Sequence, residues 1–176
     1  MKENEIIPSE LYTREYYLSD NDGHREFSQG LDSNIHDKFK RVLDLIQITE
    51  NSIVLDIGCG RGELIYYCVK NGAIGYGIDY SQDAIDIANE IKTRLSEELQ
   101  KKVFFERSTA EKYSYNQKYD YIFMVETAEH MYDWQLKKSF EKIHKSLKPT
   151  GTLIITTPNH LYENFLHTYD RTVPII

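Results

Sequence analysis

One stretch of the sequence constrains the fold more than any other: an apolar strand pattern that runs directly into a glycine-rich loop. The strand pattern spans residues 52–57, and the loop reads Gly58-Cys-Gly60-Arg-Gly62. Because glycine has no Cβ, three glycines at alternate positions let the main chain turn tightly and let a ligand approach it closely. A helical pattern follows over residues 63–70, so the loop joins the end of a strand to the start of a helix.

The same alternation of strand and helix continues along the chain. The sequence predicts further strands at 74–79, 103–106, 121–125 and 152–157, and further helices at 32–46, 81–99 and 133–147. Residues 107–118 are expected to form a loop with one turn of helix, and residues 149–151 a turn. Such alternation predicts an α/β fold with a doubly wound, mostly parallel sheet and helices on both faces.

Length and charge narrow the class of protein. The chain has 176 residues, which suits one domain and is too short for two ordinary ones. Its formal net charge of −7 makes long duplex nucleic acid a poor partner, because like charges repel. No apolar run approaches the roughly 18 residues that span a bilayer, and the start of the chain leads into no apolar signal segment. We therefore expect a cytoplasmic protein with no membrane partner.

The glycine loop differs from that of dinucleotide-binding proteins. Their fingerprint is GxGxxG, whose third glycine would fall where this chain has Glu63. Asp56 stands two residues before the first glycine, where its charge would repel a pyrophosphate but would suit a ligand with an amine or a positive charge. Asp79 ends the second expected strand, where a carboxylate can accept hydrogen bonds from both hydroxyls of a ribose. The GxGxG spacing of the loop and the charge of Asp56 argue against the alternative of a nicotinamide oxidoreductase.

The loop and its flanking residues resemble a known motif. The run Val54-Leu-Asp-Ile-Gly-Cys-Gly-Arg-Gly62 is similar to motif I of class I S-adenosylmethionine-dependent methyltransferases, and the likeness extends over about residues 30–160. The resemblance implies a Rossmann-like sheet of strand order 3-2-1-4-5, with S-adenosyl-L-methionine as the cofactor and S-adenosyl-L-homocysteine as its product. It also implies methyl transfer to an oxygen, nitrogen or carbon atom of a small molecule, as in the ubiquinone O-methyltransferase-like group.

The resemblance assigns roles to individual residues around the loop. It places Gly58, Cys59 and Gly60 against the methionine part of the cofactor. Asp56 would lie near the amino group of the cofactor, and Asp79 would take the ribose hydroxyls.

The adenine half of the cofactor is assigned in the same way. Tyr80 matches the residue that lies against the adenine ring. Residues 108–111, Ser-Thr-Ala-Glu, resemble the Asp-Ala-Glu segment that reads adenine, which assigns Thr109 and Ala110 to the cofactor. Thr109 departs from the family pattern, because a hydroxyl replaces the aspartate that usually meets the exocyclic amine. A hydroxyl can still accept a hydrogen bond but without charge, so we expect a weaker or water-mediated contact.

The chemistry of methyl transfer directs attention to the residues that follow the fourth expected strand. Displacement at a sulfonium needs an oriented acceptor and, for a hydroxyl or an amine, a group that removes a proton. His130 is the best candidate for this base, because imidazole titrates near neutrality. Glu126 would line the cofactor pocket, and Glu129 would either orient His130 or stay a solvated carboxylate. The alternative leaves His130 as a packing residue, since many members of the family work by proximity alone.

The same residues allow a metal-dependent alternative. Glu126-x-x-Glu129-His130 resembles the ExxEH segment of small-RNA 2′-O-methyltransferases, in which those residues bind a divalent metal. Carboxylates and imidazole suit Mg²⁺ or Mn²⁺, and His160 or His167 would supply a fourth ligand. The same segment occurs in ubiquinone-type methyltransferases that need no metal, and the acidic charge disfavours RNA, so we expect no metal.

Tyrosines are concentrated near the N-terminus. Residues 11–17 contain three of them. In small-molecule members of the family a helical segment before motif I closes over the cofactor, which implies that Tyr16, Tyr17 and His24 cover the site, with Tyr17 on the cofactor. The chain is therefore expected to comprise an N-terminal helical lid (1–50), a cofactor-binding core (51–160) and a C-terminal tail (161–176).

The C-terminal side is shorter than the family pattern. Members usually have seven strands, and only about 19 residues follow the fifth expected strand, so we expect the sixth and seventh strands to be absent. The fifth strand would then be an apolar sheet edge that the tail or a second copy in a homodimer covers. A chain cut short would bind cofactor without methyl transfer, which makes a non-catalytic cofactor-binding module a further alternative.

Overall fold

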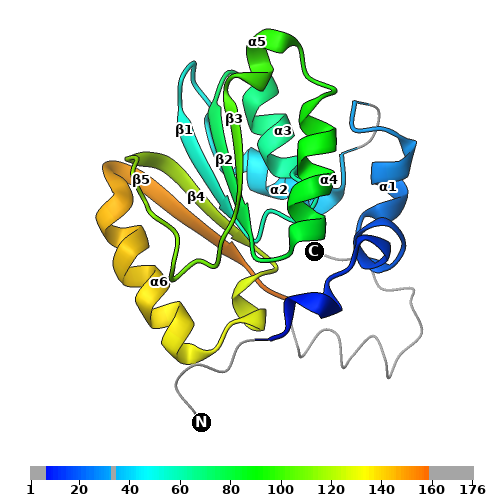
Figure 1. The fold of residues 1–176 in the computed structure, drawn as a ribbon. Coiled ribbons are helices and arrows are strands. Elements are labelled where there is room, and N and C mark those ends of the chain that lie inside the picture. The colour runs from blue at the N-terminus through cyan, green and yellow to red at the C-terminus, as the bar shows by residue number, and fades with distance from the viewer. Residues whose placement is uncertain (1–6, 33–34, 159–176) are drawn as a thin grey trace, which may run out of the picture.

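A parallel sheet of five strands forms the centre of the molecule (Figure 1). The computed structural model describes residues 7–32 and 35–158. The strand order is β3-β2-β1-β4-β5, which confirms the predicted Rossmann-like class. The strands are β1 (Ile53–Ile57), β2 (Ile74–Asp79), β3 (Val103–Arg107), β4 (Tyr119–Val125) and β5 (Leu147–Thr156).

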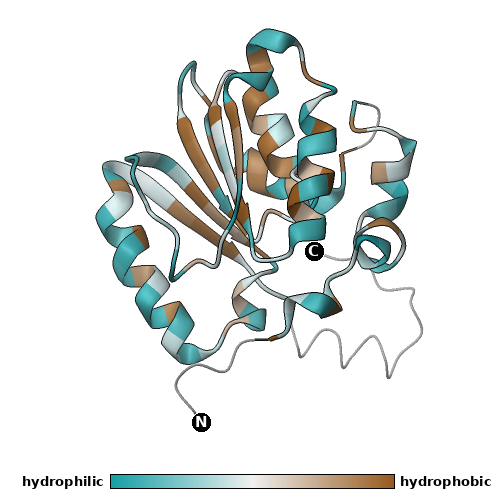
Figure 2. Ribbon diagram, in the orientation of Figure 1, coloured by the Kyte–Doolittle hydropathy of each residue, from teal (hydrophilic) through white to brown (hydrophobic). Residues whose placement is uncertain are grey.

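Helices cover both faces of this sheet, as predicted. The helices α2, α3 and α4 pack on one face, and α6 packs on the other (Figures 1 and 2). Two short helices and the α1 helix precede them and form an N-terminal segment beside the sheet. The helices are η1 (Ser9–Leu11), η2 (Tyr16–Asp20), α1 (His24–Gln29), α2 (Asp37–Asp44), α3 (Glu63–Lys70), α4 (Gln82–Lys92), α5 (Glu97–Gln100), η3 (Ala128–His130) and α6 (Asp133–Ser146).

The central strand β1 contributes to two buried apolar layers. Val54 belongs to the cluster that packs under α3 and α4, whereas Leu55 and Ile57 belong to the cluster under α6. Because both faces are covered, the strand is a continuous apolar run and does not alternate with polar residues. Asp56 is the exception, a carboxylate only 4% exposed at the end of this strand.

The predicted helix over residues 81–99 is wrong in its second half. The helix α4 ends at Lys92, and a separate short helix, α5, begins at Glu97. The hydroxyl of Ser96 accepts a hydrogen bond from the Leu99 N–H (3.4 Å) and caps the new helix, a role that serine performs well. Leu95 is buried and Leu99 packs against the same core, which explains why the apolar spacing continues across the break.

The last strand starts earlier than predicted. β5 begins at Leu147, and residues 149–151 form an irregularity within it, where we had expected a turn before it. Leu147 pairs with Tyr119 and Thr152 with Tyr121, so the extra residues form a bulge between the two pairs. The loop 108–118 contains one helix-like turn, in which the Tyr113 N–H donates to the Thr109 carbonyl (2.9 Å).

Within the described residues, β5 is an edge strand, with Ile155 40% exposed. The expected C-terminal tail (161–176), which includes His167, lies outside the described residues, and so does His160. The covering of this edge by the tail or by a homodimer therefore stays a prediction. No helix in the described ranges is long and apolar enough to cross a membrane, and the cytoplasmic location also stays a prediction.

Candidate functional site

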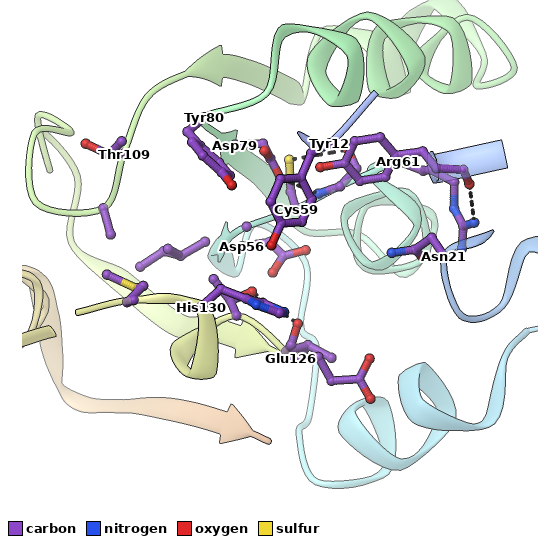
Figure 3. A pocket seen from close by; sticks show the side chains of 18 of the residues that line it. Tyr12, Asn21, Asp56, Cys59, Arg61, Asp79, Tyr80, Thr109, Glu126 and His130 are labelled. Atoms are coloured by element: carbon purple, nitrogen blue, oxygen red, sulfur yellow. Dashed lines mark hydrogen bonds between the residues drawn. The ribbon is translucent and has the colours of Figure 1, made fainter. Parts of the chain in front are cut away.

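The site residues predicted from the sequence come together in one cleft at the carboxyl ends of β1, β2 and β4 (Figure 3). The strand order reverses at β1, and ligands of such sheets bind at this reversal point. His24 and Glu129 do not line the cleft, and His24 instead lies 3.1 Å from the Asn21 carbonyl. The residues proposed for the cofactor or for catalysis all line it: Tyr17, Asp56, Gly58, Cys59, Gly60, Asp79, Tyr80, Thr109, Ala110, Glu126 and His130.

The floor of the cleft is the glycine loop, which is held tightly between neighbouring strands. The N–H groups of Gly58 and Cys59 both donate to the Ile78 carbonyl on β2 (2.8 and 2.9 Å). Gly58 has a φ of +74°, and a Cβ built there would lie 2.4 Å from Oγ1 of Thr127, after β4. Both the conformation and the space therefore require glycine at this position.

Two buried carboxyl groups, Asp56 and Asp79, flank the loop. Asp79 accepts hydrogen bonds from the N–H groups of Gly60 (3.0 Å) and Ser81 (2.9 Å). Oδ1 of Asp56 is buried and has no hydrogen-bond partner among the described residues. A buried acceptor without a donor is costly, so this oxygen fits a ligand that brings an N–H or a positive charge.

Burial raises the pKa of both carboxyl groups. For Asp56 the negative charge of Asp79 raises the pKa further, and the charge of Lys38 offsets this only in part. For Asp79 the hydrogen bonds from Ser81 and Gly60 oppose the effect of burial on the pKa. The cleft therefore holds two acidic groups whose charges would be stabilised by a cationic ligand.

A cluster of aromatic rings covers the opposite side of the cleft. The ring of Tyr12 lies 5.4 Å from Tyr80 and 6.0 Å from His130, measured between centroids. Tyr16 lies 5.2 Å from both Tyr12 and Tyr17, and Tyr17 is buried. Figure 3 shows Tyr12 and Tyr80 next to each other in the pocket. The N-terminal segment thus places three tyrosines on the cleft, Tyr12 directly after η1 and Tyr16 and Tyr17 within η2.

Sequence reasoning missed Lys38, a cation on α2 that lines the cleft. Its Nζ lies 2.8 Å from Oε2 of Glu126 and 3.4 Å from Oδ2 of Asp22. No local signal could have revealed this contact, because Glu126 is 88 residues away in the sequence. Arg61 was also missed, although it stands within the motif.

The residues proposed for the reacting end follow β4. Glu126 has a φ of +51°, a left-handed conformation that is unfavourable for a side chain of this kind, and its N–H donates to the Thr156 carbonyl (3.0 Å). His130 ends the η3 helix at the exposed mouth of the cleft. The described residues contain no group of three His, Cys, Asp or Glu side chains arranged to hold a metal ion.

A second buried acceptor lies at the adenine end predicted from the sequence. The Thr109 hydroxyl donates to Oε1 of Glu111 (2.8 Å), and the other carboxylate oxygen of Glu111 is buried with no partner in the described part of the chain. Glu111 also lines the cleft. The hydroxyl of Thr109, which replaces the usual aspartate, is therefore hydrogen-bonded to the carboxylate of Glu111.

Comparisons with known proteins match this chain to methyltransferases. A family profile described as a methyltransferase domain matches residues 48–173. The chain is 38% identical over 120 residues to a phosphoethanolamine N-methyltransferase of Plasmodium falciparum, a match that covers 66% of this chain and 43% of that protein. It is 32% identical over 116 residues to a ubiquinone biosynthesis O-methyltransferase of Coxiella burnetii, covering 65% of this chain and 47% of the relative. The chain thus spans about half the length of the curated relatives it matches.

Solved structures show the same fold. A TehB-like S-adenosylmethionine-dependent methyltransferase from Corynebacterium glutamicum matches with a TM-score of 0.63 at 18% identity, over 93% of this chain and 81% of that chain. Phosphoethanolamine N-methyltransferase 1 of Haemonchus contortus, solved with phosphoethanolamine and S-adenosylhomocysteine, matches with a TM-score of 0.67 at 13% identity, over 85% of this chain and 31% of that chain. At these identities the likeness establishes the fold alone.

Proposed function

Because this chain belongs to the class I S-adenosylmethionine-dependent methyltransferases, we propose that it transfers a methyl group from S-adenosylmethionine to an oxygen, nitrogen or carbon atom of a small molecule. The observation that carries the proposal is the buried, unpartnered oxygen of Asp56 beside the glycine loop. The loop offers close approach to its main chain, and the carboxylate offers a partner for an ammonium group. A dinucleotide would instead bring a pyrophosphate to the same carboxylate.

The residues of the cleft fit the parts of this cofactor. Asp56 would accept from its amino group, with Gly58, Cys59 and Gly60 against the methionine chain, and Asp79 would accept from the ribose hydroxyls. The cofactor supplies an activated methyl group when bound. Tyr80, Thr109 and Ala110 are proposed to contact the adenine. Tyr17 and Glu126 are proposed to form the outer wall of the cofactor pocket.

The proposed acceptor is a small molecule that enters beside His130. The names of the relatives describe one enzyme that methylates nitrogen and one that methylates oxygen, and both name small molecules. His130 would remove the proton of a hydroxyl or amine acceptor, since it lies at the mouth of the cleft with Tyr12 beside it. The net charge of −7 supports a small acceptor over a nucleic acid.

Isothermal titration calorimetry with S-adenosylmethionine, S-adenosylhomocysteine and NAD tests the proposal. We expect both sulfur nucleotides to bind and NAD not to bind. Binding of NAD alone would contradict the assignment. Transfer of a labelled methyl group to candidate amines and phenols, with and without a chelator, then separates an active enzyme from a module that only binds cofactor. Loss of transfer with chelator would favour the metal-dependent alternative.

A further inference from the structure

The side chain of Arg61 is buried inside the glycine loop, where a long cation is unexpected. Arg61 is 3% exposed, and each of its three nitrogens has a partner. Its Nε donates to Oε2 of Glu63 (2.7 Å), which neutralises the charge. Its two terminal nitrogens point away from the loop and donate hydrogen bonds to the N-terminal segment.

Those two contacts are with main-chain carbonyls, one within the η2 helix and one just after it. Nη1 donates to the carbonyl of Tyr17 (2.7 Å), and Nη2 donates to the carbonyl of Asp22 (3.0 Å). The guanidinium also lies 4.8 Å from the ring centroid of Phe27 in α1, within cation–π range. One side chain therefore joins the glycine loop to two helices of the N-terminal segment.

The geometry of this contact requires arginine in particular. A guanidinium presents donors in a fixed planar fork, so it can reach one carboxylate and two carbonyls that lie in different directions. A lysine has a single ammonium on a flexible stem and would keep the ion pair with Glu63 without holding both carbonyls. An arginine of the segment itself, Arg14, forms an ion pair with Glu90 (2.7 Å), but this pair is exposed, and such pairs contribute little.

We propose that Arg61 is a positioning residue that holds the N-terminal segment over the cleft and couples this segment to the glycine loop. Tyr12, Tyr16 and Tyr17 of this segment line the cleft. A ligand bound at the glycine loop would therefore also contact side chains whose position depends on Arg61. The inference relies on the proposed function only for the identity of that ligand. The attachment of the N-terminal segment by Arg61 does not depend on any ligand.

Hydrogen exchange of the ligand-free protein tests the attachment. In Arg61→Lys we expect amides of residues 12–22 to exchange at least about tenfold faster, as for the loss of a charge-assisted hydrogen bond. Amides of β1 should be unchanged and serve as the internal reference. Arg14→Gln is the matched control, because Arg14 also joins the segment to the rest of the protein, through its exposed ion pair with Glu90, and its exchange should stay within about twofold of wild type. Unchanged exchange in Arg61→Lys would overturn the proposal, since a role limited to the ion pair with Glu63 survives that substitution.

A second variant covers the case in which Arg61→Lys fails to fold. Arg61→Met combined with Glu63→Leu removes both buried charges together and leaves neither without a partner. It should fold and show the same fast exchange in residues 12–22, and wild-type exchange there would overturn the proposal.

Calorimetry with S-adenosylhomocysteine tests the coupling. We expect affinity to fall at least about tenfold in Arg61→Lys and to be retained in Arg14→Gln. Equal affinity in Arg61→Lys and wild type would reject the coupling. If wild type itself bound no S-adenosylhomocysteine, the proposed function would fail while the exchange result would still decide the attachment.

Discussion

At the scale of the residue, the cleft is defined by Asp56 and Asp79, two buried carboxyl groups without an ion-pair partner in the described part of the chain. The two carboxyl groups differ in their hydrogen-bond partners. Asp79 is bound by two backbone N–H groups, whereas Asp56 keeps one oxygen with no donor. The difference suits distinct parts of one ligand, hydroxyls for the first and an ammonium group for the second.

Cofactor binding should release a proton from Asp56. The pKa of this carboxyl is raised in the ligand-free protein, chiefly by burial, so its protonated form persists to higher pH than in the unfolded chain. An ammonium group lowers that pKa, so affinity for S-adenosylhomocysteine should rise as pH increases through the ligand-free pKa. Calorimetry in buffers of different ionisation enthalpy measures the proton. Asp56→Asn should remove the pH dependence, and a variant that kept it would assign the proton to another group.

Replacing Asp79 by alanine should weaken cofactor binding by at least about 1.5 kcal/mol, because charge-assisted hydrogen bonds to the ribose are lost. Titration calorimetry with S-adenosylhomocysteine measures this change. Asp86→Ala is the control, since Asp86 is an exposed carboxylate on α4, outside the cleft. Unchanged affinity in Asp79→Ala would refute the ribose role.

At the scale of the element, local sequence patterns predicted most helices and strands, but they did not predict contacts between residues far apart in the chain. The helix over residues 63–70 and the strand over 74–79 match the predicted bounds, because each has a continuous apolar pattern and a clear end. The helix over 81–99 was wrong because Ser96 starts a new helix within an unbroken apolar spacing. The positions of the site residues followed from the strand ends. The contacts of Lys38 with Glu126 and of Arg61 with the N-terminal carbonyls did not, since these partners lie 39 to 88 residues away.

The packing of the glycine loop against the residue after β4 gives a prediction at this scale. Gly58→Ala should destabilise the fold by about 2–4 kcal/mol, from a left-handed backbone and from overlap with Thr127. Gly60→Ala is the matched control, because its φ is also positive but a Cβ there would lie no closer than 3.5 Å to Tyr17. It should cost about 1 kcal/mol. Urea unfolding measures both values.

A second substitution separates the two causes in Gly58→Ala. Adding Thr127→Ala removes the atoms that a Cβ at position 58 would overlap, so part of the lost stability should return. If the double variant were no more stable than the sum of the two single changes predicts, the steric explanation would be wrong and backbone strain alone would account for the loss.

At the scale of the whole molecule, the N-terminal segment and the sheet form the two sides of one cleft. The segment contributes tyrosines, and the sheet contributes the carboxylates and the glycine loop. A ligand between them contacts both sides, so its binding free energy adds to the stability of the folded chain.

S-adenosylhomocysteine should therefore raise the melting temperature. At a concentration 100 times the dissociation constant the added stability is about 2.7 kcal/mol, which corresponds to roughly 5–10 °C for a chain of this size. Differential scanning fluorimetry measures the shift, with NAD as the control ligand. An equal shift with NAD would show that the cleft does not distinguish the two nucleotides.

The contacts of Arg61 with the N-terminal segment have a consequence for how this protein can diversify. Both contacts are with carbonyl groups, which every amino acid possesses, so they do not depend on which side chains stand at positions 17 and 22. Substitutions along the segment can therefore change the chemistry that faces the acceptor while the segment stays docked. Directed evolution toward new methyl acceptors should begin by randomising residues 12 and 16 and leaving residue 61 untouched.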